Sequence, residues 1–103
     1  MNLGKAIKEV RTNQGMSQAA LSAASGITQA ALSQIENGKR PGAATIKKIC
    51  ATLSIPESLL YVMAIEQEDV PPDKALLYEK LFPVIKGLVL QVASSPDRTN
   101  TRE

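Results

Sequence analysis

The sequence predicts an all-α fold, and three observations support that prediction. Apolar residues recur at three- and four-residue steps along most of the chain, as they do on helices with one buried face. Helix-capping residues precede several of these segments, and glycine or asparagine follows them. A length of 103 residues suits one small domain with an appendage. We therefore expect a five-helix domain over residues 1–65 and a helical segment after it.

The first helix is expected from Leu3 to Asn13, and Gly15 should end it. One stripe of this segment is apolar at helical spacing and should face the core. That stripe consists of Leu3, Ala6, Ile7 and Val10.

Two short capped helices then organise the rest of the chain. Ser17 is a good N-cap for the first, and Gly26 can end it with positive φ. Thr28 caps the second, which Asn37 and Gly38 close, so a tight turn joins the two. Their shared apolar interface should contain Ala20, Leu21, Ala24, Ala31, Leu32 and Ile35. The second helix then presents an outward strip made of Gln29, Ala30, Ser33, Gln34 and Asn37.

This strip has the chemistry of a DNA major-groove reader. Amide side chains match the N6/N7 edge of adenine, and an alanine methyl group suits the methyl group of thymine. The capped pair is therefore interpreted as a helix-turn-helix. The stretch from Met16 to Gly38 also resembles the lambda repressor and Cro type of DNA-binding domain, often called the XRE-like family. The resemblance covers about Leu3 to Leu60.

The resemblance implies roles for individual residues. It assigns base reading to Gln29, Ala30, Ser33 and Gln34. It also implies that Gln18 contacts the DNA backbone and braces Gln29, and that Arg11 pairs with Glu36 to orient the recognition helix. The alternative is that these are ordinary surface amides and a solvated arginine. The chain departs from the better-known readers of the family at Ala30, which cannot donate a hydrogen bond.

A basic loop over residues 38–42 follows the recognition helix and should lie beside the phosphates that flank the groove. The alternative is a solvated charge pair. The predicted phosphate-contacting residues are Gln18, Thr28, Asn37, Lys39 and Arg40. Where the family commonly has a Ser or Thr cap after this loop, the chain has Gly42 and Ala43.

Two further helices should complete the domain. The fourth is expected from about Ala44 to Leu53, and Ser54 is expected to cap a fifth that has Pro56 in its first turn. Cys50 is interpreted as a core residue rather than a nucleophile. The expected buried residues of the fourth helix are Ile46, Ile49, Cys50 and Leu53.

Residues 66–72 are acidic and contain two prolines, so they are predicted to form a linker or a sharp corner. The segment 73–93 is an apolar helical appendage, in which Pro83 should cause a kink or separate two helices near Phe82. Its apolar stripe is predicted to form a homodimer interface, and the alternative is that it folds back on the fifth helix. The interface residues are Leu77, Leu81, Val84, Ile85, Leu88 and Val92. Residues 94–103 are expected to be disordered.

Composition narrows the function classes. With no His and one Cys, the chain offers no zinc site and no Cys/His or Ser/His catalytic pair, so we expect no enzyme, metal or cofactor. An aromatic content of 3% disfavours single-strand binding by base stacking. Seven basic residues oppose two acidic ones up to Ile55, whereas three oppose six from Pro56 to Ala93. Positive charge therefore accompanies the capped helices, as a surface that binds a polyanion needs.

These observations predict a sequence-specific, double-stranded-DNA-binding regulator, a repressor or autoregulator, that acts as a homodimer on a near-palindromic operator. It is expected in the cytoplasm, at the nucleoid, without a membrane partner. The sequence leaves open whether the regulator excludes or recruits RNA polymerase, and whether it responds to a small-molecule effector. Phage repressors, restriction-modification controllers and antitoxin-type autoregulators also stay open. The alternative is a protein-interaction module that keeps the fold and uses its apolar C-terminal segment.

Overall fold

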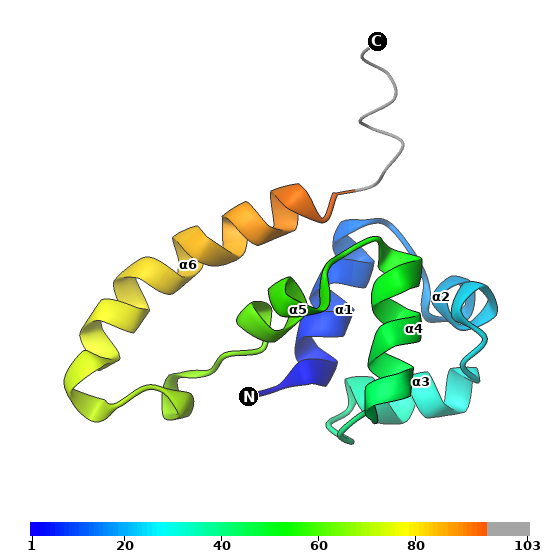
Figure 1. Ribbon diagram of the computed structural model, residues 1–103, viewed down its shortest axis with the longest axis horizontal. Helices are drawn as coiled ribbons and strands as arrows, with labels where there is room; N and C mark the ends of the chain where they lie inside the picture. Colours follow the sequence, from blue (N-terminus) through cyan, green and yellow to red (C-terminus); the bar gives the residue numbers. More distant parts are fainter. Residues whose placement is uncertain (95–103) are drawn as a thin grey trace, which may run out of the picture.

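The computed structural model describes residues 1–94, and this part of the chain is all-α (Figure 1). The prediction of a five-helix domain followed by a helical appendage is confirmed. The helices are α1 (Leu3–Asn13), α2 (Gln18–Ser25), α3 (Gln29–Glu36), α4 (Ala43–Leu53), α5 (Glu57–Met63) and α6 (Ala75–Val92). Two 3-10 turns, η1 (Gln67–Asp69) and η2 (Pro72–Lys74), connect α5 to α6. The expected disordered tail lies outside the described residues, apart from Ser94.

The capped pair of helices forms as predicted. The Ser17 hydroxyl accepts a hydrogen bond from the backbone N–H of Ala20 at 3.0 Å, and α2 ends at Gly26 in the left-handed conformation. The Thr28 hydroxyl accepts from the N–H of Ala31 at 3.1 Å and starts α3 in the same way. Each cap satisfies a backbone donor that the first turn of a helix leaves free.

One prediction about this pair is wrong. Ala20 and Ala24 are expected on the inner face of α2, but both are exposed. Leu21 alone is buried in α2, because a helix of eight residues in contact with α3 and α4 turns only one narrow side inward. The inner side of α3 is formed by Leu32 and Ile35, as expected.

The core lies between α1 and the four helices around it. The predicted stripe of α1 is buried, and it packs with side chains from α3, α4 and α5 in one continuous cluster. Among the fully buried side chains are Ile7, Val10, Leu21, Leu32, Ile49, Leu53 and Leu60. The two helices of the capped pair are therefore fixed by packing against α1 and α4 as well as against each other.

The start of α5 differs from the prediction. Ser54 does not cap α5; it ends α4 in the left-handed conformation, with φ of 57°, and Pro56 occupies the N-cap position of α5. This geometry lets the N–H of Ile55 donate to the Cys50 carbonyl at 3.1 Å and turns the Ile55 side chain into the core. The burial of Ile55 therefore sets the left-handed conformation of Ser54. α4 itself begins at Ala43, with Gly42 before it and no side-chain cap.

The appendage is one helix rather than two. α6 continues through Pro83, so the alternative of two helices that meet near Phe82 is wrong, and the chain turns at Pro71 and Pro72, immediately before α6. The carboxyl end of α6 folds back on the domain, where Val89 and Ala93 join the core.

Two polar side chains at the end of α1 hold the carboxyl end of α6 in place. Asn13 donates to the Leu90 carbonyl at 3.0 Å, and Gln14 donates to the Ala93 carbonyl at 2.7 Å. Both bonds use backbone acceptors that the last turn of a helix leaves free. The docked end of α6 is therefore fixed by hydrogen bonds as well as by apolar packing.

The remaining apolar stripe of α6 stays exposed. Each of its six residues named above is at least 41% exposed, so packing on the domain accounts for only one side of this helix. Within residues 1–94, no helix combines the length and the apolar character that crossing a bilayer requires.

Two contacts fix α3 against α1. Gly4 of α1 lies so close to the end of α3 that a Cβ atom there would overlap the Ile35 carbonyl oxygen. The second contact is a buried ion pair between Arg11 and Glu36, with Nε to Oε2 at 2.8 Å and Nη2 to Oε1 at 2.9 Å. The Arg11 and Glu36 side chains are 8% and 2% exposed. Arg11 also donates to the Met16 carbonyl at 2.7 Å, which ties the loop before α2 to the same guanidinium.

Gly4→Ala should lower the free energy of unfolding by about 2–3 kcal/mol, because the atoms that obstruct the new methyl group are backbone and can be relieved only by moving α3. Gly87→Ala is the matched control. It makes the same change inside α6, where nothing apart from the helix's own neighbouring backbone lies within 4 Å of the new Cβ, and it should raise the free energy of unfolding by about 0.5–1 kcal/mol. Urea denaturation followed by circular dichroism measures both. A Gly4→Ala variant as stable as the wild type would contradict this close approach.

The ion pair should make stability depend on acidity. Burial by itself would raise the pKa of Glu36, but hydrogen bonds from Arg11 and Gln18 and the charge of Arg11 outweigh it, so the pKa lies below the ordinary 4.5. A carboxyl group with a lowered folded pKa contributes stability that is fully present above its unfolded pKa and is lost as pH falls through the folded value.

Glu36→Gln should therefore cost about 2 kcal/mol of unfolding free energy at neutral pH, because Arg11 no longer has a charged partner. The difference from wild type should shrink as the pH falls below 4.5. Glu57→Gln serves as the control, because its ion pair with Lys47 is exposed and contributes little. Urea titrations across the acid range test this. A difference between wild type and Glu36→Gln that does not change with pH would contradict the linkage.

Candidate nucleic-acid interface

The outward side of α3 carries the polar strip. Gln29, Ala30 and Gln34 are exposed, and Ser33 is half-buried. The hydrophobic side chains that anchor α3 point the other way, because Leu32 and Ile35 follow the same helical period half a turn out of phase. The four residues that the family resemblance assigns to base reading thus share one solvent-facing side of a fixed helix.

Gln18 stands at the start of α2 and is only half-exposed. Its amide Nε2 donates to Glu36 Oε1 at 3.0 Å, so this side chain joins the ion pair between Arg11 and Glu36. The brace from Gln18 to Gln29 that the resemblance implies is therefore not the observed arrangement. The cause is electrostatic: a carboxylate is a stronger acceptor than a neutral amide oxygen. One amide N–H and the amide oxygen of Gln18 are not used in this hydrogen bond.

The loop after α3 is shaped by its backbone. Gly38 has φ of 120°, a value that favours glycine, and its N–H donates to the Ile35 carbonyl at 3.0 Å. The N–H of Lys39 donates to the Gln34 carbonyl at 2.9 Å. Pro41 is buried, whereas Asn37, Lys39 and Arg40 are exposed. The loop therefore holds its three polar side chains in solvent on a backbone anchored at both ends.

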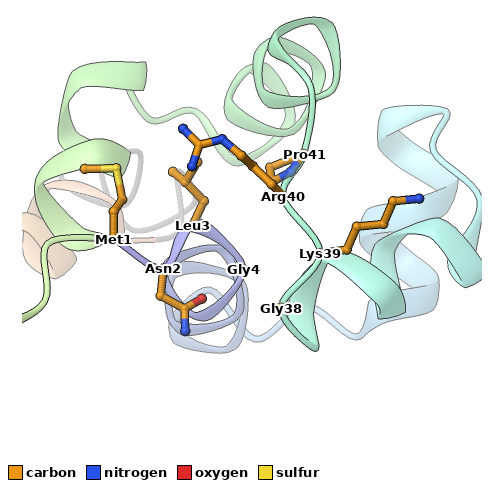
Figure 2. Close-up of a pocket in the computed structure, with 8 residues that line it drawn as sticks. All are labelled: Met1, Asn2, Leu3, Gly4, Gly38, Lys39, Arg40 and Pro41. Carbon is orange, nitrogen blue, oxygen red and sulfur yellow. The ribbon is translucent and has the colours of Figure 1, made fainter.

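Two pockets flank this loop. One lies between the loop and the start of α1, and Figure 2 shows Lys39 and Arg40 extending in opposite directions there, with Arg40 directed toward the side of Leu3. The other is lined by Lys39 and Arg40 together with Gln34 of α3 and Thr45 of α4. The end of the polar strip and the two cations consequently border the same hollow in the surface. The carboxyl end of the polar strip therefore lies beside the basic loop.

The charges of the chain are distributed unevenly around α3. Lys5, Lys8 and Lys48 are exposed like the loop cations, while Lys47 pairs with Glu57 at 3.2 Å. The acidic residues of η1 and the whole of α6 lie away from α3 (Figure 1). Lys39 and Arg40 border the polar strip and Lys8 lies near Glu36 of α3, whereas Lys5 lines a pocket with Glu66 and Glu68. The cations nearest to α3 are therefore Lys8, Lys39 and Arg40, and the acidic segment lies away from them.

Three supporting residues are not predicted from the sequence. Asn2 caps α1 by accepting from the Lys5 N–H at 3.0 Å, and its position before the apolar stripe could have revealed it. Gln14 donates to the carbonyls of Leu53 and Ala93, both at 2.7 Å, and no local pattern signals such distant partners. Thr45 lies beside Gln34 in the pocket only because α4 packs there.

Comparison with known proteins gives a consistent result. A family model described as helix-turn-helix (HTH_3) matches residues 7–60. Over 63 residues the chain is 41% identical to the uncharacterized HTH-type transcriptional regulator RghRB of Bacillus subtilis (strain 168), which covers 59% of this chain and 45% of the relative. It is 40% identical over 63 residues to the HTH-type transcriptional repressor RghR of the same organism, with 58% of this chain and 47% of the relative covered. No solved structure gives a significant match.

The matched family segment starts inside α1 and ends inside α5, so it contains the capped pair, the basic loop and α4. It stops before η1 and α6. The alignments span about half the length of the curated relatives. Because the family model covers more than half of this chain, including the whole of α2, α3 and α4, the chain belongs to the lambda-repressor-like helix-turn-helix family of DNA-binding transcriptional regulators.

Proposed function

We propose that this chain is a sequence-specific, double-stranded-DNA-binding transcriptional repressor that acts as a homodimer on a near-palindromic operator. The observation that carries the proposal is the exposed, uncharged polar strip of α3, held by a buried ion pair and bordered by exposed cations. A protein of this kind acts in the cytoplasm, at the nucleoid. A repressor blocks transcription when it occupies a site that RNA polymerase needs.

Base reading is assigned to four residues of α3. Gln29 and Gln34 each present a donor and an acceptor on one plane, which suits the N6/N7 edge of adenine. Ala30 offers an apolar contact for a thymine methyl group, and the Ser33 hydroxyl can donate or accept. Because all four lie on one side of an eight-residue helix, they can enter a major groove together.

Phosphate contacts are assigned to the residues that border α3. Lys39 and Arg40 supply positive charge from the loop, and Asn37 supplies a neutral donor beside them. The Thr28 hydroxyl accepts from Ala31 and keeps its own hydrogen for a phosphate oxygen. Gln18 keeps one amide N–H free for the same purpose. These contacts would fix the position of α3 along the groove without reading sequence.

The homodimer is assigned to α6. Its apolar stripe remains exposed after the carboxyl end has packed on the domain, and large exposed apolar stripes on helices mark interaction surfaces. α6 contacts η1, η2 and α5, so pairing through it leaves α3 free. Two copies would then place their α3 helices in successive major grooves, about 34 Å apart.

The same stripe is also the observation that favours the second candidate function, a protein-interaction module without specific DNA binding. A gel-shift assay with mixed genomic fragments separates the two. Retention of particular fragments supports the repressor, whereas no retention at low salt supports the interaction module.

Gln29→Ala should weaken binding to an operator selected from a random duplex pool by roughly 5- to 150-fold and relax base preference at one position per half-site, because alanine cannot form the bidentate pair of hydrogen bonds.

Lys39→Ala should weaken binding to all DNA evenly and flatten the dependence of log affinity on log salt by about 0.9 for each phosphate that is no longer neutralised. Lys80→Ala in α6 is the charge control and should change neither. Fluorescence anisotropy titrations at several salt concentrations measure all three. Equal losses on every duplex from Gln29→Ala would refute its assignment as a base reader.

Leu88→Glu should convert a dimer into a monomer and lower operator affinity by roughly 100-fold or more, because the second half-site no longer benefits from linkage to the first. Leu76→Glu is the matched control. Leu76 is exposed to a similar degree, 65% against 59%, but lies outside the stripe on the same helix. Sedimentation velocity gives the oligomeric state of each variant. If both variants remain dimers, the α6 stripe is not the dimer interface.

A further inference from the structure

The inference concerns how two copies fit together through α6, and it rests on the homodimer proposed above. Six exposed aliphatic side chains form one face of this helix, which we call the α6 face: Leu77, Leu81, Val84, Ile85, Leu88 and Val92. At about 100° of rotation per residue these positions fall within a narrow sector of the helix. A separate sector holds the residues that pack on the domain, including Val89 and Ala93.

The α6 face is symmetric along the helix. Its midpoint lies between Val84 and Ile85, and Leu81 and Leu88 are equally far from it on either side. Leu77 and Val92 form the outer pair in the same way. An antiparallel second copy centred on this midpoint would therefore place an aliphatic residue opposite every aliphatic residue of the face. A two-fold axis requires this kind of self-complementary surface.

None of the six residues of the α6 face is charged. Lys74 lies beside Leu77 and also borders the apolar groove there, to which it contributes its methylene stem because the lining is almost wholly apolar. Lys86, which follows Ile85, points to the domain and pairs with Glu9 at 2.9 Å. Glu79 and Lys80 lie outside the sector that the face occupies. Like charges facing each other across an interface would oppose self-association. The uncharged α6 face therefore does not oppose self-association.

A groove on the amino-terminal half of α6 decides the orientation. It has a volume of about 280 Å³ and an almost wholly apolar lining, with Ile65 and Val70 on one side and Leu77, Leu81 and Ile85 on the other. Tyr78 and Phe82 also line the groove, and their side chains are held in place. The Tyr78 hydroxyl donates to the Ile65 carbonyl at 3.0 Å, and the Tyr78 ring stacks on Phe82 with centroids 4.8 Å apart.

The carboxyl-terminal half of α6 has the opposite shape. Leu88 and Val92 are 59% and 66% exposed, and neither lines that groove. A parallel pairing would set groove against groove and protruding residues against protruding residues. An antiparallel pairing sets the protruding half of each copy against the grooved half of the other, and it also opposes the two helix dipoles.

We propose that two copies of this chain pair through antiparallel α6 helices, with Leu88 and Val92 of each copy seated in the apolar groove between α6 and the Ile65–Val70 segment of the other. The two-fold axis passes between Val84 and Ile85. Leu81 of one copy then faces Leu88 of the partner subunit, and Leu77 faces Val92 of the partner subunit. The groove is the part of the interface that sets the register.

Disulfide cross-linking tests this register directly. The variants are Leu77→Cys, Val92→Cys and the double change in one chain, all at exposed positions. In the proposed dimer the two copies of residue 77 are separated by about 22 Å along the helices, whereas residue 77 faces residue 92 of the partner. A disulfide requires Cα atoms within about 7 Å. Under mild oxidation the double variant should therefore run as a covalent dimer, and each single variant should not.

The wild type is the control for the native thiol. Cys50 is buried, and burial together with the nearby Glu57 raises its pKa to about 11, so it should not cross-link under the same conditions. Sedimentation of the unoxidised wild type is measured in parallel, so that dimer formation and the register of pairing are tested separately. Circular dichroism establishes that each variant keeps the helical content of the wild type.

Each outcome has a defined meaning. Cross-linking of either single variant by itself would show parallel pairing and overturn the register while leaving the homodimer intact. A dimeric wild type whose double variant does not cross-link would place the interface elsewhere, with the same consequence. A monomeric wild type would overturn both the pairing and the homodimer. The base-reading assignment is tested separately, by the Gln29→Ala titration.

Discussion

The contact between α1 and α3 is the constraint on which the interface depends. Gly4 allows the two helices to approach until backbone meets backbone, and the ion pair of Arg11 with Glu36 fixes their rotation about that contact. The pair gains little net free energy if the cost of burying two charges offsets their attraction. Its value lies in geometry, because two hydrogen bonds in a fork accept only one orientation of the helix that bears Glu36.

The contact between α1 and α3 sets the position of the polar strip. α3 has only eight residues and would not be stable by itself, so its capping by Thr28 and the burial of Leu32 and Ile35 have to act together. The Gln18 amide, at the start of α2, also donates to the Glu36 carboxylate, so α2 is connected to the ion pair. α1, α2 and α3 thus meet at one buried carboxylate. A groove-reading surface needs such rigidity, since a hydrogen bond to a base edge tolerates little misalignment.

α6 serves two purposes with two of its sides. One side supplies Val89 and Ala93 to the core and is held by Asn13 and Gln14 at the end of α1. The other side stays exposed, and the groove beside it is formed jointly with the segment that leads out of α5. Because the helix is docked on the domain, anything bound to its exposed side has a defined orientation relative to α3. This arrangement would fix the spacing of two recognition helices in a dimer.

The sequence by itself determined the five helices of the domain, a helical segment after them, the two caps at Ser17 and Thr28 and the outward strip of α3. These features depend on neighbours within about one helical turn, and such short-range preferences can be seen in the residues themselves. Only the tertiary structure decided that Ser54 ends α4, since the burial of Ile55 sets that turn, and that Gln18 donates to Glu36 rather than to Gln29. It also decided the single course of α6 through Pro83 and its docking by Gln14. Those outcomes depend on partners distant in the chain, whose positions are known only once the core has packed.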